Sequence, residues 1–590
     1  MSISTKHLSL YAALLIAFAF TVLTTQKINN RIAGNDTCLC ANDGFGYYMY
    51  LPSIINRGEI EINTNWAQDI QNTYCDSNLI YQIVQSKIDK PINIYHIGLS
   101  YIKLPSYIIA HTISKNTSYP TDGFSLPYYI SHYLNALFFI LLGLHYLRKL
   151  LLLYTSELNT SLIILVAYFG TNMYATFSIQ ADLPHLYLFT LNTIFIYHLT
   201  QYISNTKYRD LIITLIVFGI ATAIRPTQAV LGIIPLILLQ KKLGFNLRLW
   251  KQILLFPLAS ILFNIPQFLY WKYLGGEWVI PNLHTEDIVL IDPNTLDFLF
   301  SFRKGWFLYS PVFILLIPGF IYTYRINKPV FWSIFTFTFL YIWILSSWEC
   351  WWYAGSFGSR VMVDIYPFLL LIIGIGLPAI KSNISKASII SFSLICIGLN
   401  LFQTRQLNTG IIDSTRMSKE HYLYTFGRLE IDKFNNSRLL MNRYDTNWIH
   451  SVEEKNLEFY QIQTKEIFAL DKTLIATPKE DLTIGRFTIL DELPSDESLI
   501  TVRFTAKSNN PSETSIIRLE TVSPYNCYSW NSMEISQGST KDLETEYEMQ
   551  FNLPDIRHRN DEMQLYIDND KDVQIELTSF TIEAKTLIRK

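Results

Sequence analysis

The chain has 590 residues, of which 50% are hydrophobic and only 16% are charged, and its formal net charge at pH 7 is -2. Soluble domains have nearer a quarter of charged residues, so this composition predicts a membrane protein with a polar appendage. The balanced charge and the lack of a basic patch argue against nucleic-acid binding.

The first apolar run follows Lys6 and His7 and extends from Leu8 to Thr24. No convincing small-residue cleavage site follows this run, so we interpret it as an uncleaved membrane span rather than a signal peptide. A transmembrane helix needs ~20 mostly apolar residues. On this basis we predict about eleven transmembrane helices, at residues 8–26, 126–147, 161–179, 183–203, 210–224, 227–240, 252–270, 306–323, 329–347, 361–380 and 387–403.

The basic residues predict the orientation of these spans. With the N-terminus in the cytoplasm, every predicted cytoplasmic turn is short and basic, as the positive-inside rule requires. The turns contain Arg148, Lys149, Lys207, Arg209, Lys241, Lys242, Arg248, Lys251, Arg325, Lys328, Lys381 and Lys386. The predicted outer segments are residues 27–125, 271–305, 348–360 and everything from 404 onward.

The first outer loop, residues 27–125, contains a semi-apolar stretch at 95–111 (YHIGLSYIKLPSYIIAH). This pattern is typical of helices that lie along the membrane surface, and a re-entrant or buried segment is the alternative. Three of the six cysteines lie in this loop. In an oxidising compartment Cys75 is expected to pair with Cys38 or Cys40, and free thiols are the alternative. The CLC spacing does not match a zinc knuckle.

The C-terminal part has a different composition. We interpret residues 1–403 as the membrane domain and residues 404–467 as a connecting segment. From Phe468 onward, short runs such as LITVRFTA (499–506) and SIIRLETV (515–522) alternate apolar and polar residues between turn-forming residues. This period of two predicts an antiparallel β-sandwich over residues 468–590.

Several ionisable residues stand out at the predicted outer face. Asp43 lies in NDGFGYYMY (42–50), where glycines allow close approach and Tyr47 offers a ring to a sugar or lipid headgroup. The alternative is a solvated loop acid. Asp182 and His185 lie between two predicted spans, where charge is costly, although helix capping also explains them. Arg225 interrupts an apolar hairpin and is expected to bind an anion such as phosphate or to snorkel to the interface.

Two further outer segments contain candidates. Arg303 and Lys304 precede a predicted span on the outer side, against the basic-inside bias. Residues 346–367 contain Trp348, Glu349 and Arg360, and an aromatic belt is the alternative for their tryptophans. Acids that can deprotonate a hydroxyl and cations that can hold a departing phosphate therefore share one face. This combination favours group transfer from a phosphate-linked lipid donor.

Other functions are less well supported. The sequence has no GxSxG or HExxH motif, and isolated glycines do not support ATP hydrolysis. A transporter usually has charges within its spans and related halves, and neither is clear.

The chain resembles the GT-C class of integral-membrane glycosyltransferases, which includes protein O-mannosyltransferases and the aminoarabinose transferases of lipid A, and in particular uncharacterised Bacteroidetes-type members. The similar stretches are DGFGYYMYLPSI (43–54), NIYHIGLSYIKLPSYIIAH (93–111), DGFSLPYY (122–129), FGTNMYA (169–175), DLPHLY (182–187), AIRPT (223–227), QFLYWKYLGGEW (267–278), LFSFRKGWFLYSP (299–311) and WWYAGSFGSRVMVDIYP (351–367). They cover most of residues 1–380.

The resemblance implies an inverting transferase that uses a polyprenyl-phosphate sugar at the periplasmic side of the bacterial inner membrane. Asp43 matches the general base, and Asp182 matches a second acid. The donor phosphate would contact Arg225, Lys304 and Arg360. The cavity would be lined by Tyr47, His96, His185, Arg303, Trp348 and Glu349.

The sequence departs from the family at three places. Ile94 stands where the family often has a lysine, Gly44 stands where mannosyltransferases have a second acid, and residues 282–294 fit the family loop poorly. The C-terminal sandwich resembles a carbohydrate-binding jelly roll, and a docking or stabilising domain is the alternative.

The expected partners are the bilayer, the lipid-linked donor and a glycan, lipid or protein acceptor. We predict no resident cofactor and no metal site, and the sequence leaves dependence on a divalent metal open. The alternative functions are a glycan ligase or polymerase, and a non-enzymatic envelope transporter or scaffold.

Overall fold

The computed structural model describes residues 7–34, 38–75, 80–280, 287–431, 438–454, 460–470, 472–508, 515–523, 527–535, 544–569 and 574–589. Parts of the predicted segments 282–294 and 404–467 lie outside the described residues. The chain forms two compact units. The first unit comprises Met1–His284, Pro293–Ser347 and Trp351–Ser414, and the second comprises Thr285–Asp292, Trp348–Cys350 and Thr415–Lys590.

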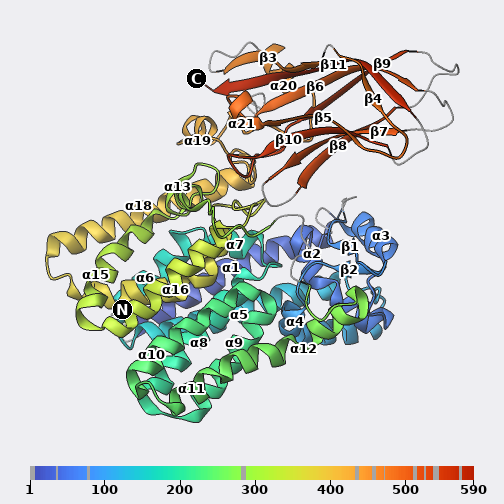
Figure 1. The fold of residues 1–590 in the computed structure, drawn as a ribbon. Coiled ribbons are helices and arrows are strands. Elements are labelled where there is room, and N and C mark those ends of the chain that lie inside the picture. The colour runs from blue at the N-terminus through green and yellow to red at the C-terminus, as the bar shows by residue number, and fades with distance from the viewer. Residues whose placement is uncertain are drawn as a thin grey trace. The chain divides into compact units, whose positions relative to one another are not determined.

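The first unit is almost entirely helical (Figure 1). Its longer helices are α1 (Leu8–Ile32), α3 (Thr64–Tyr74), α4 (Gly98–Lys115), α5 (Leu126–Leu151), α6 (Glu157–Phe169), α8 (His185–Asn205), α9 (Tyr208–Ile224), α10 (Ile233–Leu243), α12 (Leu255–Gly275), α15 (Leu316–Ile326), α16 (Lys328–Ser346), α17 (Tyr366–Gly376) and α18 (Asn383–Asn408). Its shorter helices are α2 (Asn42–Tyr48), η2 (Pro52–Arg57), α7 (Met173–Ile179), η3 (Pro226–Gly232), α11 (Leu247–Ile253), α13 (Thr295–Phe300), α14 (Trp306–Tyr309), η4 (Pro311–Leu315), η5 (Arg360–Ile365) and η6 (Leu377–Ala379). Strands β1 (Ile83–Gln85) and β2 (Pro91–Asn93) form an antiparallel pair.

Six helices of the described chain are long and apolar enough to cross a membrane, or seven if the bent pair α6–α7 is one span. The six are Leu8–Ile32, Leu126–Leu151, Leu247–Gly275, Lys328–Ser346, Arg360–Ala379 and Asn383–Asn408. The prediction of about eleven spans was therefore too high, although every predicted segment contains helix.

The difference has a physical reason in the remaining segments. Helix α9 has only 17 residues and α10 only 11, which is short for a bilayer. Helix α8 is long enough, but it buries polar side chains such as Asn192 and His198 among its neighbours, which lowers its hydropathy. Most residues of α8 and α9 are buried inside the helical unit, so the apolar composition of these two helices reflects that burial.

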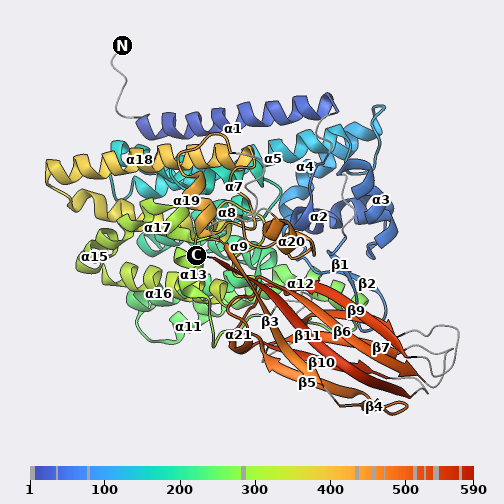
Figure 2. The ribbon, with the colours of Figure 1, turned by 90° about the horizontal axis from the view of Figure 1, so that it is seen from above.

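Exposed apolar side chains support the assignment of a membrane protein. Helix α1 packs on one side against α5 and α6, and the arrangement of α1 beside α5 is visible in Figure 2. On other faces, Phe18 of α1, Leu262 of α12 and Ile395 of α18 are each at least 60% exposed. Soluble monomers rarely present many large apolar side chains together. Long apolar helices with such faces indicate a membrane protein.

The second unit is a β-rich domain. Its strands are β3 (Tyr460–Leu470), β4 (Leu474–Ala476), β5 (Leu482–Thr488), β6 (Ser498–Ser508), β7 (Ser515–Val522), β8 (Cys527–Ile535), β9 (Thr545–Asn552), β10 (Glu562–Asp568) and β11 (Ile575–Arg589), and its helices are α19 (Lys419–Thr425), α20 (Trp448–Glu454) and α21 (Ile489–Glu492). One antiparallel sheet has the order β5-β10-β7-β8, and the other has β3-β11-β6-β9 with β4 beside β11.

The predicted alternation places side chains of both sheets in one core. Leu519 of β7 and Leu565 of β10 come from the first sheet, and Phe504 of β6 and Phe580 of β11 come from the second. Successive residues of β7 and β10 alternate between buried and half-buried positions. The β-rich C-terminal region is therefore confirmed, and its first strand begins at Tyr460, before the predicted boundary.

Candidate functional site

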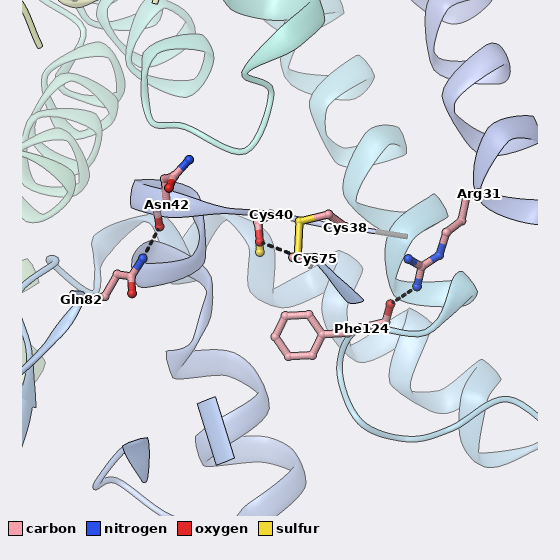
Figure 3. The surroundings of a disulfide bond; sticks show 7 residues. All are labelled: Arg31, Cys38, Cys40, Asn42, Cys75, Gln82 and Phe124. Carbon is pink, nitrogen blue, oxygen red and sulfur yellow. Dashed lines mark hydrogen bonds between the residues drawn. A yellow bond between two sulfur atoms is a disulfide. The ribbon is translucent and has the colours of Figure 1, made fainter. Parts of the chain in front are cut away.

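Asp43 lies in the first turn of the short helix α2, and a disulfide bond stabilises the segment that leads into this helix. Cys38 pairs with Cys75, which follows α3, and Cys40 is a buried free thiol. The amide of Gln82 also donates to the backbone carbonyl of Asn42 at 2.9 Å. Figure 3 shows the disulfide and this hydrogen bond on either side of Cys40. The position of Asp43 therefore depends on cross-links from later parts of the loop.

The Asp43 carboxylate has three hydrogen-bond donors. Tyr81 and Tyr95 donate their hydroxyls to Oδ1 at 2.7 and 2.8 Å. Arg360 donates from Nη2 to Oδ2 at 2.6 Å, and the Asp43 side chain is still 26% exposed. Burial acts to raise the pKa of Asp43, but the Arg360 charge and the two tyrosine hydrogen bonds outweigh it, so the pKa lies below its usual value. Asp43 is thus held as an ionised carboxylate that solvent can reach.

Arg360 comes from the start of η5, a helix that packs against α8. Its Nη1 donates to the carbonyl of Gly355 at 3.2 Å, and its Nη2 donates to Asp43. Its Nε is buried and has no acceptor among the described residues. An arginine binds a planar anion best with Nε and Nη2 together. Asp43 therefore pairs with Nη2 and leaves Nε without an acceptor among the described residues.

Asp182 lies directly beside helix α2. A methyl group added to Gly44 would come within 1.9 Å of Oδ2 of Asp182. The ammonium of Lys103, in α4, donates to the backbone carbonyl of Asp182 at 2.9 Å. Burial raises the pKa of Asp182, and the Lys103 charge opposes this only in part while the charge of Asp43 adds to it. Burial lowers the pKa of Lys103 to about 8, against the opposing effect of Asp182.

Two acids in one site thus have pKa values shifted in opposite directions. Asp43 is stabilised as a carboxylate by Arg360, whereas burial favours the protonated form of Asp182. Such divergence between neighbouring carboxyl groups is typical of sites that divide acid and base roles. The site therefore places an ionised carboxylate, Asp43, beside a second carboxyl group, Asp182, whose raised pKa favours its protonated form.

Arg225 has a carboxylate partner in the structure. Its Nη1 lies 3.3 Å from Oδ2 of Asp364, a fully buried residue of η5. His185 contacts the other oxygen of Asp364 at 2.8 Å, and Tyr341 donates to Oδ2 at 3.1 Å. The guanidinium of Arg225 remains 17% exposed. In the structure, Asp364 is thus the anion that pairs with Arg225. His185 contacts Asp364 and not Arg225.

The Asp43 and Asp364 groups are close enough to act on one tyrosine. Burial raises the pKa of Tyr47 to about 12, and the charges of Arg225, Asp43, Arg360 and Asp364 all contribute to that value. Tyr47 is therefore within electrostatic reach of both ion pairs, and η5 supplies a residue to each pair. We call Asp43, Arg360, Asp182, Arg225 and Asp364 the charged cluster.

Other predicted site residues have different surroundings. The ammonium of Lys304 is buried and donates to the backbone carbonyls of Ser356 and Ser414. The guanidinium of Arg303 lies over the ring of Trp352, 3.8 Å from its centroid. His96 packs edge-on against Trp271, with ring centroids 5.4 Å apart. The contacts of Lys304 make it a link between two loops of the first unit.

Trp348 and Glu349 belong to the second unit. Glu349 is fully buried there, and its Oε2 accepts from Arg557 Nη1 at 2.5 Å and from the backbone NH of Asp287 at 2.8 Å. Trp348 forms an antiparallel bridge with Ile288. These contacts give both residues a structural role in joining residues 287–288 to residues 348–349 within the second unit.

Sequence reasoning missed three contacts of the charged cluster. Tyr95 and Asp364 lie in stretches that carry the resemblance, NIYHIGL and RVMVDIY, but nothing in a single sequence marks them as partners of Asp43 and Arg225. Tyr81 has no motif around it.

Among the described residues, no group of three or more His, Cys, Asp or Glu side chains is placed to hold a metal ion.

Two hollows in the described part of the chain are not lined by Asp43. A small cavity of about 10 Å³ lies beside Lys103 and is lined by Tyr48, Lys103, Ser106, Tyr107, Tyr128, Ser131 and His132. A wider depression of about 490 Å³ lies in the second unit and is lined by Leu490, Pro494, Ser495, Asp496, Ile556, Arg557, His558 and Arg559. The Asp43 side chain itself is partly exposed to solvent.

The comparisons with known proteins give no assignment. A scan against models of known protein families found no match, and a search of curated protein sequences also found none. The function is therefore argued from the charged cluster.

Proposed function

We propose that the chain is a membrane glycosyltransferase that moves a sugar from a polyprenyl-phosphate donor to an acceptor hydroxyl. The observation that carries the proposal is the direct pairing of Asp43 with Arg360, 2.6 Å apart. A carboxylate can take the proton of a hydroxyl, and a guanidinium can hold a phosphate. The group proposed to act on the acceptor hydroxyl and the group proposed to hold the phosphate thus belong to one site.

In the proposed reaction, Asp43 takes the proton from the acceptor hydroxyl as its oxygen attacks the anomeric carbon of the sugar. The bond between that carbon and the phosphate oxygen breaks, and the electron pair leaves with the polyprenyl phosphate. Arg360 and Arg225 stabilise the charge that develops on this phosphate. Attack opposite to the leaving group inverts the anomeric configuration.

The other residues have supporting roles in this proposal. Asp182, whose pKa is raised by burial, is the second acid of the site. Lys304 is assigned to loop positioning because its ammonium already donates to two backbone carbonyls. Asp364 pairs with Arg225, and His185 contacts the other oxygen of Asp364.

We propose that Asp43 faces the periplasm of a bacterial inner membrane. The disulfide between Cys38 and Cys75 supports this side, because disulfides persist in oxidising compartments. The long apolar helices with exposed apolar faces support the membrane location.

A transfer assay tests the proposal. Purified protein is incubated with a panel of labelled polyprenyl-phosphate sugars and a mixed acceptor preparation, and transfer is measured for the wild type and for Asp43→Asn. We expect transfer from at least one donor by the wild type and loss of transfer in the variant. Equal transfer by both proteins would refute the role of Asp43, and no transfer from any donor would refute the enzyme. Unchanged envelope glycans in cells with Asp43→Asn, but altered glycans after deletion of the chain, would instead favour the scaffold.

A further inference from the structure

The contact between Asp43 and Arg360 blocks the reaction proposed above in its resting form. A carboxylate that accepts a short hydrogen bond from a guanidinium and two more from tyrosines has three of its about four lone-pair sites occupied. Such a group is a poor acceptor for a further proton. Arg360 is likewise engaged by a protein anion before any phosphate arrives. Both groups must change partners before they can act on a donor and an acceptor.

The geometry of Arg360 favours such a change. Asp43 contacts only Nη2, with one oxygen, while the buried Nε on the same side of the guanidinium has no acceptor among the described residues. Burying an unpaired donor is costly. A phosphate presents several oxygens and can fill both positions at once. The second carboxylate oxygen of Asp43 is held away from Arg360 by Tyr81 and Tyr95.

We infer that Asp43 and a phosphate ester compete for Arg360, so that the arrival of the donor phosphate releases the Asp43 carboxylate for the acceptor hydroxyl. Tyr81 and Tyr95 keep their hydrogen bonds to Oδ1 and hold the carboxylate in position during the exchange. This inference rests on the proposed function, since it explains how one site couples donor binding to base activation. Without a donor, Asp43 stays paired with Arg360.

The exchange has a consequence for binding alone. Asp43 is a competitor for the phosphate site, so its removal strengthens phosphate binding even though it abolishes transfer. A carboxylate that only repelled the phosphate through its charge would weaken binding with or without Arg360, so the double variant with Arg360→Gln separates repulsion from competition for Arg360. A gain in binding that requires Arg360 therefore distinguishes the exchange from repulsion.

The test measures the Kd of sugar-free polyprenyl phosphate, and separately of inorganic phosphate, for the full-length purified protein. In Asp43→Asn, which keeps an acceptor for both tyrosines, we expect the Kd for polyprenyl phosphate to fall at least about tenfold. In Arg360→Gln we expect weak binding, and the double variant should bind as weakly as Arg360→Gln because the gain acts through Arg360. Tightening for both ligands would assign the site to phosphate itself, and tightening for the lipid alone would assign it to the lipid-linked form.

The matched control is Glu59→Gln. Glu59 pairs with Arg57 in the same unit, at 2.8 Å, but outside the charged cluster. This variant should bind as the wild type does. An unchanged or weaker affinity in Asp43→Asn would overturn the exchange. If that variant does not keep the wild-type melting temperature, Asp43→Ser serves in the same comparison.

The result also separates the exchange from the proposed function. Tighter phosphate binding in Asp43→Asn, together with no sugar transfer by the wild type, would leave the exchange standing and remove the glycosyltransferase. Sugar transfer by the wild type with unchanged phosphate binding in Asp43→Asn would support the glycosyltransferase and refute the exchange.

Discussion

Arg360 donates to Asp43 across 2.6 Å, although the two residues are 317 positions apart in the sequence. Asp43 belongs to the first helix after α1, and Arg360 begins η5 after the tryptophan-rich segment. Their contact brings the two ends of the first unit into one charged cluster.

Removal of either tyrosine hydroxyl should change the pH dependence of sugar transfer. Tyr81 and Tyr95 each lower the pKa of Asp43 by donating to it, so Tyr81→Phe and Tyr95→Phe should raise that pKa. Since the ionised carboxylate is the active form, the acidic limb of the pH–rate profile should move to higher pH. Arg360 is the cation that faces Asp43.

The control for this shift is Tyr74→Phe, because Tyr74 donates to Asp122 elsewhere in the same unit. Its pH–rate profile should match that of the wild type. An identical acidic limb in all three variants would contradict the assignment of Asp43 as the titrating base.

Gly44→Ala should damage the site. A Cβ at Gly44 would lie 1.9 Å from the Asp182 carboxylate, so the acid or helix α2 must shift. Overpacking of this kind costs roughly 1–3 kcal/mol, and we expect a lower melting temperature and loss of transfer. Gly398→Ala in α18 is the control, because nothing lies within 4 Å of its added methyl group. Full activity in Gly44→Ala would argue against close packing of Asp182 on α2.

Asp182→Asn should stabilise the fold at neutral pH. The pKa of Asp182 is raised in the folded state, so the folded protein binds this proton more tightly than the unfolded chain. Stability therefore falls as the pH rises from the unfolded pKa through the folded pKa. The variant lacks this loss, so its melting temperature should exceed that of the wild type at neutral pH and match it in acid. A lower melting temperature at neutral pH would show that the charged form is favourable.

Loss of the disulfide should weaken the first outer segment. The double variant Cys38→Ser/Cys75→Ser removes the cross-link that precedes α2. Disulfides typically stabilise by ~2–4 kcal/mol, and we expect earlier proteolysis of residues 38–75 and reduced transfer, measured by limited digestion and by the transfer assay. Cys527→Ser, at an exposed free cysteine, should change neither. Equal digestion of all three proteins would show that the disulfide does not hold this segment.

The sequence predicted the elements better than their contacts. The first apolar run and the alternating C-terminal runs lead directly to α1 and to the two sheets, because period and composition are local properties. Burial inside the helical unit was not separable from burial in lipid, so α8 and α9 were counted as spans. Apolar composition alone does not distinguish these two surroundings.

The site was predicted in part for a similar reason. Asp43, Arg360, Asp182 and Arg225 were chosen because their charge is unusual at the ends of apolar segments, and the structure brings them near one another. The sequence did not predict Tyr81 as a partner of Asp43 or Asp364 as a partner of Arg225, because these pairs form only through tertiary contact. Lys304 was chosen for the same reason, but its ammonium donates to two backbone carbonyls and lies outside the charged cluster.

The turnover rate of sugar transfer in Asp43→Asn, compared with Glu59→Gln and the wild type, tests the central claim most directly. If Asp43 is the base, the rate should fall at least about 10²-fold in Asp43→Asn while Glu59→Gln keeps the wild-type rate. A rate in Asp43→Asn equal to that of the wild type would contradict the account.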